Sequence, residues 1–189
     1  MGAAAILGAV GFALMFLSEP GVLTERGFKL LFPSGLLALA GATLLMFIYS
    51  SFHGVLDAVL LALGALALGA EIYVLFFAIP FSESYVGDAD GRRVVDTGAY
   101  GLCRHPGVIC LFAVYLFWGL AALPEPGFLC LGIAFSILNG LYALYQDIYS
   151  FPRIFSDYAE YRRRVPFLIP DRAGRAARTP PSARKKETK

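Results

Sequence analysis

Residues 54 to 80 read GVLDAVLLALGALALGAEIYVLFFAIP, about 27 residues without a lysine or an arginine. This stretch decides the fold class, because a helix that spans a bilayer needs about 20 consecutive and predominantly apolar residues. Its extra length predicts a helix that is tilted or that extends past the bilayer. The first inference is therefore a helix in a membrane.

Five such apolar stretches run at about residues 2 to 17, 30 to 50, 54 to 80, 107 to 123 and 127 to 147. Hydrophobic residues make up 58% of the 189 residues and charged residues only 16%, which argues against a soluble protein. The first stretch has no basic residues ahead of it, so we interpret it as a spanning helix and not as a secretory signal. The sequence predicts an all-α, polytopic bundle of five transmembrane helices.

The basic residues predict the orientation of this bundle. Arg26 and Lys29 lie between the first and second stretches, and Arg92, Arg93 and Arg104 lie between the third and fourth. The other eleven of the sixteen follow position 152. Because lysine and arginine collect in cytoplasmic connections, we expect the N-terminus outside and the C-terminus in the cytoplasm.

A polar loop precedes the fourth stretch. Residues 98 to 106 read GAYGLCRHP, and Pro106 suits the first position of a helix, where its missing N–H costs nothing. The connection between the fourth and fifth stretches is short, so these helices form an antiparallel hairpin. Arg104 and His105 are therefore expected beside the end of the fifth stretch, where Gln146 and Asp147 lie.

Two polar features inside the apolar stretches have two interpretations each. Asn139, Tyr142, Gln146 and Tyr149 recur on one helical face, either to line a site or to bond neighbouring helices. Glu71 is a costly carboxyl at membrane depth, so it either faces a partner or cavity or lies near the inner interface. The sequence leaves both pairs of alternatives open.

The segment after the fifth stretch predicts an amphipathic helix at the cytoplasmic interface. One face of that segment carries five apolar or aromatic residues: Phe151, Ile154, Phe155, Tyr158 and Tyr161. Residues 165–170 then form an apolar return that we expect to pack against the bundle. Residues 1–170 are predicted to form one membrane-embedded domain, and residues 171–189 a basic disordered tail that can contact anionic lipids.

Several of these motifs occur in one order in a known group of enzymes. Tyr100 and Arg104-His105-Pro106 precede the penultimate span, Gln146-Asp147 ends the last one, and residues 155–161 read FSDYAEY. Over about residues 85–170 the chain resembles the isoprenylcysteine carboxyl methyltransferase and phospholipid methyltransferase superfamily of integral-membrane enzymes. The resemblance implies transfer of a methyl group from S-adenosylmethionine to an apolar or lipid-like acceptor at the cytoplasmic interface.

The resemblance also implies roles for individual residues. The residues implied to bind S-adenosylmethionine are Tyr100, Arg104, His105, Pro106 and Gln146, and those implied in catalysis are Asp147 and Arg153. The chain departs from the family at Gln146, where an acidic residue is usual, and at Val108, where tyrosine is frequent. These departures indicate either a different substrate or a loss of activity.

Two other functions stay open. Membrane sterol reductases have similar Arg-His-Pro regions and use NADPH, although their larger number of helices argues against this reading. A non-catalytic membrane binding subunit is the third reading, and Gln146 and Val108 are its best support. Cys103, Cys110 and Cys130 have no metal-ligand spacing, so no metal is predicted. The expected partners are membrane lipids and the acceptor, with no nucleic acid.

Overall fold

The computed structural model describes residues 1–19, 28–50, 54–78, 93–123 and 126–169. These residues form helices and connecting segments, with no β-strand among them. In chain order the helices are α1 (Gly2–Leu17), α2 (Phe28–Ile48), α3 (Val55–Phe76), η1 (Gly98–Gly101), α5 (Pro106–Ala121), α6 (Gly127–Tyr145), η2 (Gln146–Ser150), α7 (Phe151–Ile154) and α8 (Tyr158–Arg164). The predicted all-α class is confirmed for the described residues, whereas the predicted tail at 171–189 lies outside them.

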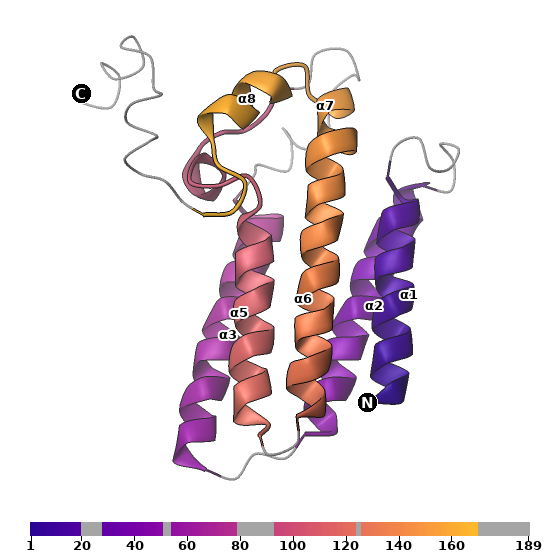
Figure 1. Cartoon of the computed structure of the whole chain (residues 1–189), viewed down its shortest axis with the longest axis vertical. Helices are drawn as coiled ribbons and strands as arrows, with labels where there is room; N and C mark the ends of the chain where they lie inside the picture. Colours follow the sequence, from indigo (N-terminus) through magenta and orange to yellow (C-terminus); the bar gives the residue numbers. More distant parts are fainter. Residues whose placement is uncertain (20–27, 51–53, 79–92, 124–125, 170–189) are drawn as a thin grey trace, which may run out of the picture.

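The five long helices pack side by side in one bundle (Figure 1). α1 packs along α2, and α5 packs between α3 and α6. Small residues permit the closest approaches, since a Cβ atom added to Gly11 would lie 2.8 Å from the carbonyl oxygen of Gly35. Such contacts between small residues are typical of helices that associate within lipid.

The buried core lies where α1, α2, α5 and α6 meet. Phe12 and Phe135 pack with ring centroids 5.9 Å apart, and Tyr115 contacts Phe135 edge-on at the same centroid distance. The Tyr115 and Thr43 hydroxyls form a hydrogen bond of 2.8 Å, so the one polar atom of the Tyr115 side chain is satisfied inside the bundle. This packing fixes α5 and α6 relative to the other helices.

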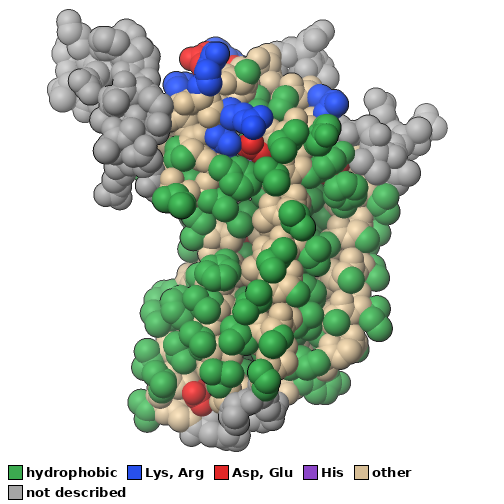
Figure 2. Space-filling view, in the orientation of Figure 1, with side chains coloured by type: hydrophobic (Ala, Val, Ile, Leu, Met, Phe, Trp, Pro, Cys, Tyr) green, Lys and Arg blue, Asp and Glu red, His purple; other side chains and the backbone are tan. Residues whose placement is uncertain are grey.

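Three helical segments of the described chain are long and apolar enough to cross a membrane: Leu30–Ile48, Val55–Phe76 and Gly127–Ile154. α1 and α5 are shorter apolar helices of 16 residues each. Hydrophobic side chains cover the flanks of the bundle, while lysine and arginine gather at one end (Figure 2). The protein therefore has the surface of a membrane protein, with a polar end outside the apolar band.

We call the polar end the basic end; among the described side chains it comprises Arg93, Arg104, Arg153 and Arg162–Arg164. α1, α3 and α6 finish there, and α2 and α5 begin there (Figure 1). The alternation of helix directions that the apolar pattern predicts is thus present, and the polar loop and the end of α6 meet at this end.

The prediction of one amphipathic helix after residue 150 is wrong. α7 ends at Ile154, and Phe155 adopts an extended conformation with φ −111° and ψ 121° before α8 begins at Tyr158. The break turns the chain back over the bundle, so that Tyr158 and Tyr161 become buried. The apolar pattern is used for packing against the protein's own loop 93–106 and α7.

Candidate functional site

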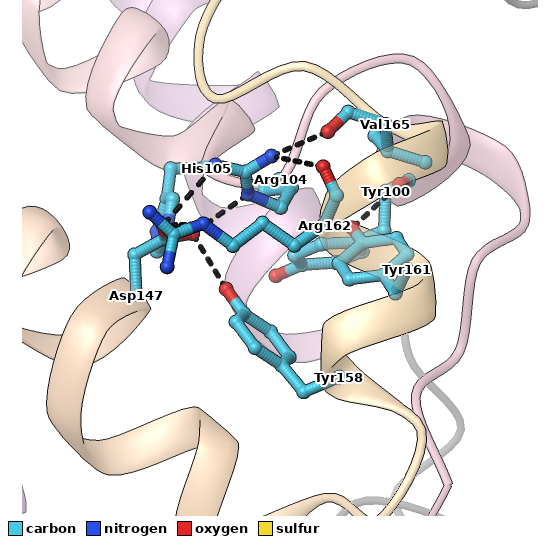
Figure 3. A network of polar contacts seen from close by, with 8 residues as sticks. All are labelled: Tyr100, Arg104, His105, Asp147, Tyr158, Tyr161, Arg162 and Val165. Atoms are coloured by element: carbon cyan, nitrogen blue, oxygen red, sulfur yellow. Dashed lines mark hydrogen bonds and ion pairs between the residues drawn. The ribbon is translucent and has the colours of Figure 1, made fainter.

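The site is built on the loop that crosses the end of α3 and leads into α5. Gly98 has a φ of +58°, a left-handed conformation that glycine adopts without steric cost. The Tyr100 hydroxyl donates a hydrogen bond of 3.3 Å to the carbonyl oxygen of Val74 on α3. The Tyr100 carbonyl oxygen accepts one of 2.7 Å from the Tyr161 hydroxyl on α8 (Figure 3). Tyr100 therefore joins α3 to α8 at the border of the site.

Arg104 lies at the centre of the site and is only 8% exposed. Its Nε donates to Asp147 Oδ1 at 2.7 Å and its Nη2 donates to Asp147 Oδ2 at 3.1 Å. Its Nη1 donates to the carbonyl oxygens of Val165, at 2.5 Å, and of Arg162, at 3.1 Å. The guanidinium thus binds a carboxylate on η2, directly after α6, and also caps the C-terminus of α8, where a cation is favourable.

Asp147 receives donors from two segments, the loop before α5 and α8, and is 1% exposed. Besides the two bonds from Arg104, its Oδ1 accepts a hydrogen bond of 2.6 Å from the Tyr158 hydroxyl. Arg162 Nε lies 3.5 Å from Oδ2. Figure 3 shows these side chains converging on the carboxylate. The buried carboxylate thus joins η2 to the loop before α5 and to α8.

The tyrosines of α8 are uncharged parts of this network. Burial raises the pKa of Tyr158, and the hydrogen bond to Asp147 raises the pKa further, because that bond needs the phenolic proton. Burial also raises the pKa of Tyr161, against a smaller opposing effect of Arg104. Both phenols therefore remain hydrogen-bond donors throughout the neutral range.

His105 differs from its neighbours because one of its ring nitrogens is unsatisfied. Its Nε2 lies 3.4 Å from Asp147 Oδ1. The atom is buried and makes no hydrogen bond of good geometry, so its one polar contact is this approach to the Asp147 carboxylate, which becomes an ion pair when the imidazole is protonated. The imidazole stacks on Phe151, with centroids 5.8 Å apart and an interplanar angle of 9°, and contacts Phe167 at 4.9 Å. A buried polar atom of this kind marks a position for a ligand or for proton transfer.

The backbone of the loop is held by the apolar return. The amide of Arg104 donates to the carbonyl oxygen of Pro166 at 2.9 Å, and that of His105 donates to Phe167 at 3.2 Å. Pro106 is the first residue of α5, as its residue type predicts, and its side chain is buried. The predicted packing of the return at 165–170 is confirmed for residues 165–167, whereas Ile169 is 82% exposed and residue 170 lies outside the described residues.

Gln146 lies beside this cluster but bonds in another direction. Its Nε2 donates at 2.7 Å to Oε1 of Glu19, which also accepts a bond from the Tyr142 hydroxyl. Glu19 is 5% exposed and follows the end of α1. Sequence reasoning missed Glu19, although an acidic residue directly after an apolar stretch is a usable signal. Glu19 places a carboxylate beside Gln146, the position at which an acidic residue is usual in the family that the sequence resembles.

Arg153 stands apart from Arg104, His105 and Asp147. It is exposed on α7, donates a hydrogen bond to the carbonyl oxygen of Tyr149, and lies 5.6 Å over that residue's ring. The structure thus gathers three of the predicted residues in one cluster and leaves Arg153 at the rim. An arginine there is available to solvent or to a headgroup.

The described residues contain no group of three or more His, Cys, Asp or Glu side chains arranged to hold a metal ion. Cys103, Cys110 and Cys130 are free thiols, and burial raises the pKa of Cys103.

Comparison with known proteins shows a partial similarity. No family model matches the chain, and no solved structure matches it. Over 88 residues the chain is 31% identical to the nickel-cobalt-cadmium resistance protein NccN of Alcaligenes xylosoxydans xylosoxydans. The similarity covers 46% of this chain and 40% of that protein. A match over these shares does not show the family.

Proposed function

We propose that the protein is an integral-membrane methyltransferase that transfers a methyl group from S-adenosylmethionine to an apolar or lipid-like acceptor. In this proposal all five long helices span the membrane, with the N-terminus outside and the basic end in the cytoplasm. Reaction at the basic end would join a water-soluble donor to an acceptor that arrives through the membrane.

The observation that carries the proposal is the meeting of Arg104, His105 and Asp147 in one buried cluster. Arg104 and Asp147 lie 43 positions apart and belong to the two motifs on which the resemblance rests. The cluster lies between the apolar band and the polar surface. That position supports chemistry on a substrate held partly in lipid.

The fit of the donor rests on the unsatisfied Nε2 of His105. The imidazole is held between aromatic rings and beside a carboxylate, so this nitrogen is oriented before any ligand arrives. Bound S-adenosylmethionine would supply an electrophilic methyl carbon, to which the acceptor's lone pair bonds as the C–S bond breaks and sulfur keeps the electron pair. His105 would accept a hydrogen bond or a proton, and the aromatic residues would exclude water.

The remaining residues would position these groups. The paired Asp147 and Arg104 would hold the loop and α8 over the donor, and Glu19 would hold Gln146 toward α1. Exposed Arg153 would lie where the anionic part of an acceptor can reach it. The buried imidazole of His105 would face a donor bound within the protein, and the exposed charge of Arg153 would face an acceptor bound at its edge.

Isothermal titration of the full chain in detergent with S-adenosylhomocysteine tests the proposal. Wild-type protein is expected to bind the ligand. In a separate unfolding experiment, its free energy of unfolding should rise by about 2.7 kcal/mol at a ligand concentration 100 times Kd. His105→Ala should weaken binding, whereas Ser136→Ala should not, since its hydroxyl bonds only the Gly132 carbonyl within α6.

A parallel titration with NADPH separates the alternatives. If the protein binds NADPH but not S-adenosylhomocysteine, the result would contradict methyl transfer and favour a reductase. Binding of neither ligand would also contradict it and favour a binding subunit, a reading that the closely paired Asp147 supports.

A further inference from the structure

Glu71 is a buried carboxyl for which the site described above has no use. It lies five residues before the end of α3 and is 9% exposed. Its Oε2 is buried and has no hydrogen-bond partner in the described part of the chain. Such an atom inside a membrane helix is unfavourable unless something binds there.

The carboxyl faces the first turn of α5. A Cβ atom added to Gly107 would lie 3.2 Å from Glu71 Oε2 and 3.3 Å from Oε1. The glycine thus lets the carboxyl lie directly against the α5 backbone, two residues after His105. Glu71 Oε2 on α3 therefore lies against the turn of α5 that follows His105, whose Nε2 also has no hydrogen-bond partner in the described part of the chain.

Asp147 and Glu71 differ in whether their carboxyl oxygens already have hydrogen-bond partners. Both oxygens of Asp147 are taken by Arg104, and Oδ1 also accepts from Tyr158. Glu71 has no ion pair among the described residues, where the cations pair elsewhere or lie at the surface. Of these two carboxyls beside the Arg104-His105-Pro106 motif, Glu71 is the one with an oxygen free to bind a cation.

We propose that Glu71 binds the positively charged sulfonium of the methyl donor. This inference rests on the proposed function and names a charge partner for it. A sulfonium cannot donate a hydrogen bond, so it is held by opposite charge and by close packing. The buried carboxyl of Glu71, which lies against the first turn of α5 because Gly107 has no side chain, would lose its proton on binding and supply the negative charge.

The test compares three ligands that differ at one centre. S-adenosylmethionine has a sulfonium, sinefungin has a protonated amine at that place, and S-adenosylhomocysteine has a neutral thioether. For Glu71→Gln we expect binding of the two cations to weaken by about tenfold or more, since a charge pair in a protein interior is lost. Binding of the thioether should change by less than about twofold.

Asp57→Asn is the matched control, because it removes a carboxylate from the opposite end of the same helix. Asp57 Oδ2 accepts a hydrogen bond from the Gly54 amide at 3.0 Å, which asparagine can replace. The control should leave all three affinities unchanged. Glu71→Asp, which keeps the charge, should retain the preference for cations.

The affinities of the wild-type protein give a result that does not depend on how Glu71→Gln folds. Wild-type protein should itself bind the two cationic ligands more tightly than the thioether, and equal affinities would overturn the inference. Equal weakening of all three ligands in Glu71→Gln, or no change, would overturn it while the proposed function stands. Failure of wild-type protein to bind any of the three would overturn both.

Discussion

Arg104 and Asp147 form an ion pair with two hydrogen bonds, of 2.7 and 3.1 Å, between the loop before α5 and η2, which continues α6. The same guanidinium caps α8 through the carbonyl oxygens of Arg162 and Val165. One buried pair therefore determines how three segments meet at the basic end. The ion pair positions His105 through the backbone of the same loop.

Removing one member of this pair should destabilise the protein strongly. Arg104→Met or Asp147→Leu leaves a buried charge without its partner, and each should lower the free energy of unfolding by about 3–5 kcal/mol. The double variant should lose less than the sum of the two. Unfolding in detergent, analysed as a double-mutant cycle, measures the coupling. Additive losses would show that the two residues do not depend on each other.

Exchanging the residues of the Glu19–Gln146 contact should show which groups must be present. Glu19→Gln alone should destabilise the contact, since an amide replaces the charged acceptor of Tyr142 and Gln146. Gln146→Glu alone would place a second carboxyl where the Gln146 amide now lies 2.7 Å from Glu19. It should lower the free energy of unfolding by about 1–3 kcal/mol. The double variant restores one carboxyl and one amide, so its thermal midpoint should return toward wild type. A double variant less stable than both singles would contradict this view.

Alkaline pH should weaken the attachment of α8. The pKa values of Tyr158 and Tyr161 are raised in the folded protein, so their contribution to stability is complete below the ordinary tyrosine pKa of about 10. It is lost as pH rises above that value toward the folded pKa, because the unfolded chain ionises first. Unfolding midpoints between about pH 8 and pH 11 should fall less in Tyr158→Phe than in wild type. The exposed Tyr149→Phe should fall as wild type does; an identical fall in all three proteins would count against the assignment.

Arg153 should matter for the acceptor and not for folding. Because its side chain is exposed, Arg153→Ala should change the free energy of unfolding by less than about 0.5 kcal/mol. S-adenosylhomocysteine affinity should be unchanged, while the KM for an anionic acceptor should rise. Calorimetry and steady-state kinetics distinguish the two effects. A loss of S-adenosylhomocysteine binding in Arg153→Ala would place the arginine in the donor site instead.

The helices of the bundle could be predicted from apolar length alone. The stretch predicted at 54 to 80 contains α3 at Val55–Phe76, and the other four stretches agree with their helices to within a few residues. Hydropathy succeeds here because a membrane helix must satisfy its backbone internally. It does not show where the helix leaves the apolar band, so the predicted ends of α2 and α3 were too late.

The candidate site could be predicted only in part. Arg104, His105 and Asp147 meet because a short hairpin brings the start of α5 to the end of α6, which connection length indicates. The extended residue Phe155 interrupts an unbroken apolar pattern, and periodicity carries no signal for such a break. Glu19 bonds Gln146 across 127 positions, a contact that no local pattern reveals. The pairing of Glu19 with Gln146 is the part of the site that the sequence does not predict.

The most direct measurement is methyl transfer itself. Purified protein is incubated with a membrane extract and S-adenosylmethionine labelled in its methyl group, and the label in the lipid fraction is counted. We predict that wild-type protein and Ser136→Ala incorporate the label. The rate of incorporation should be lower by about 100-fold or more in His105→Ala. Binding of the donor without incorporation into any extracted acceptor, or undiminished incorporation by His105→Ala, would contradict this prediction.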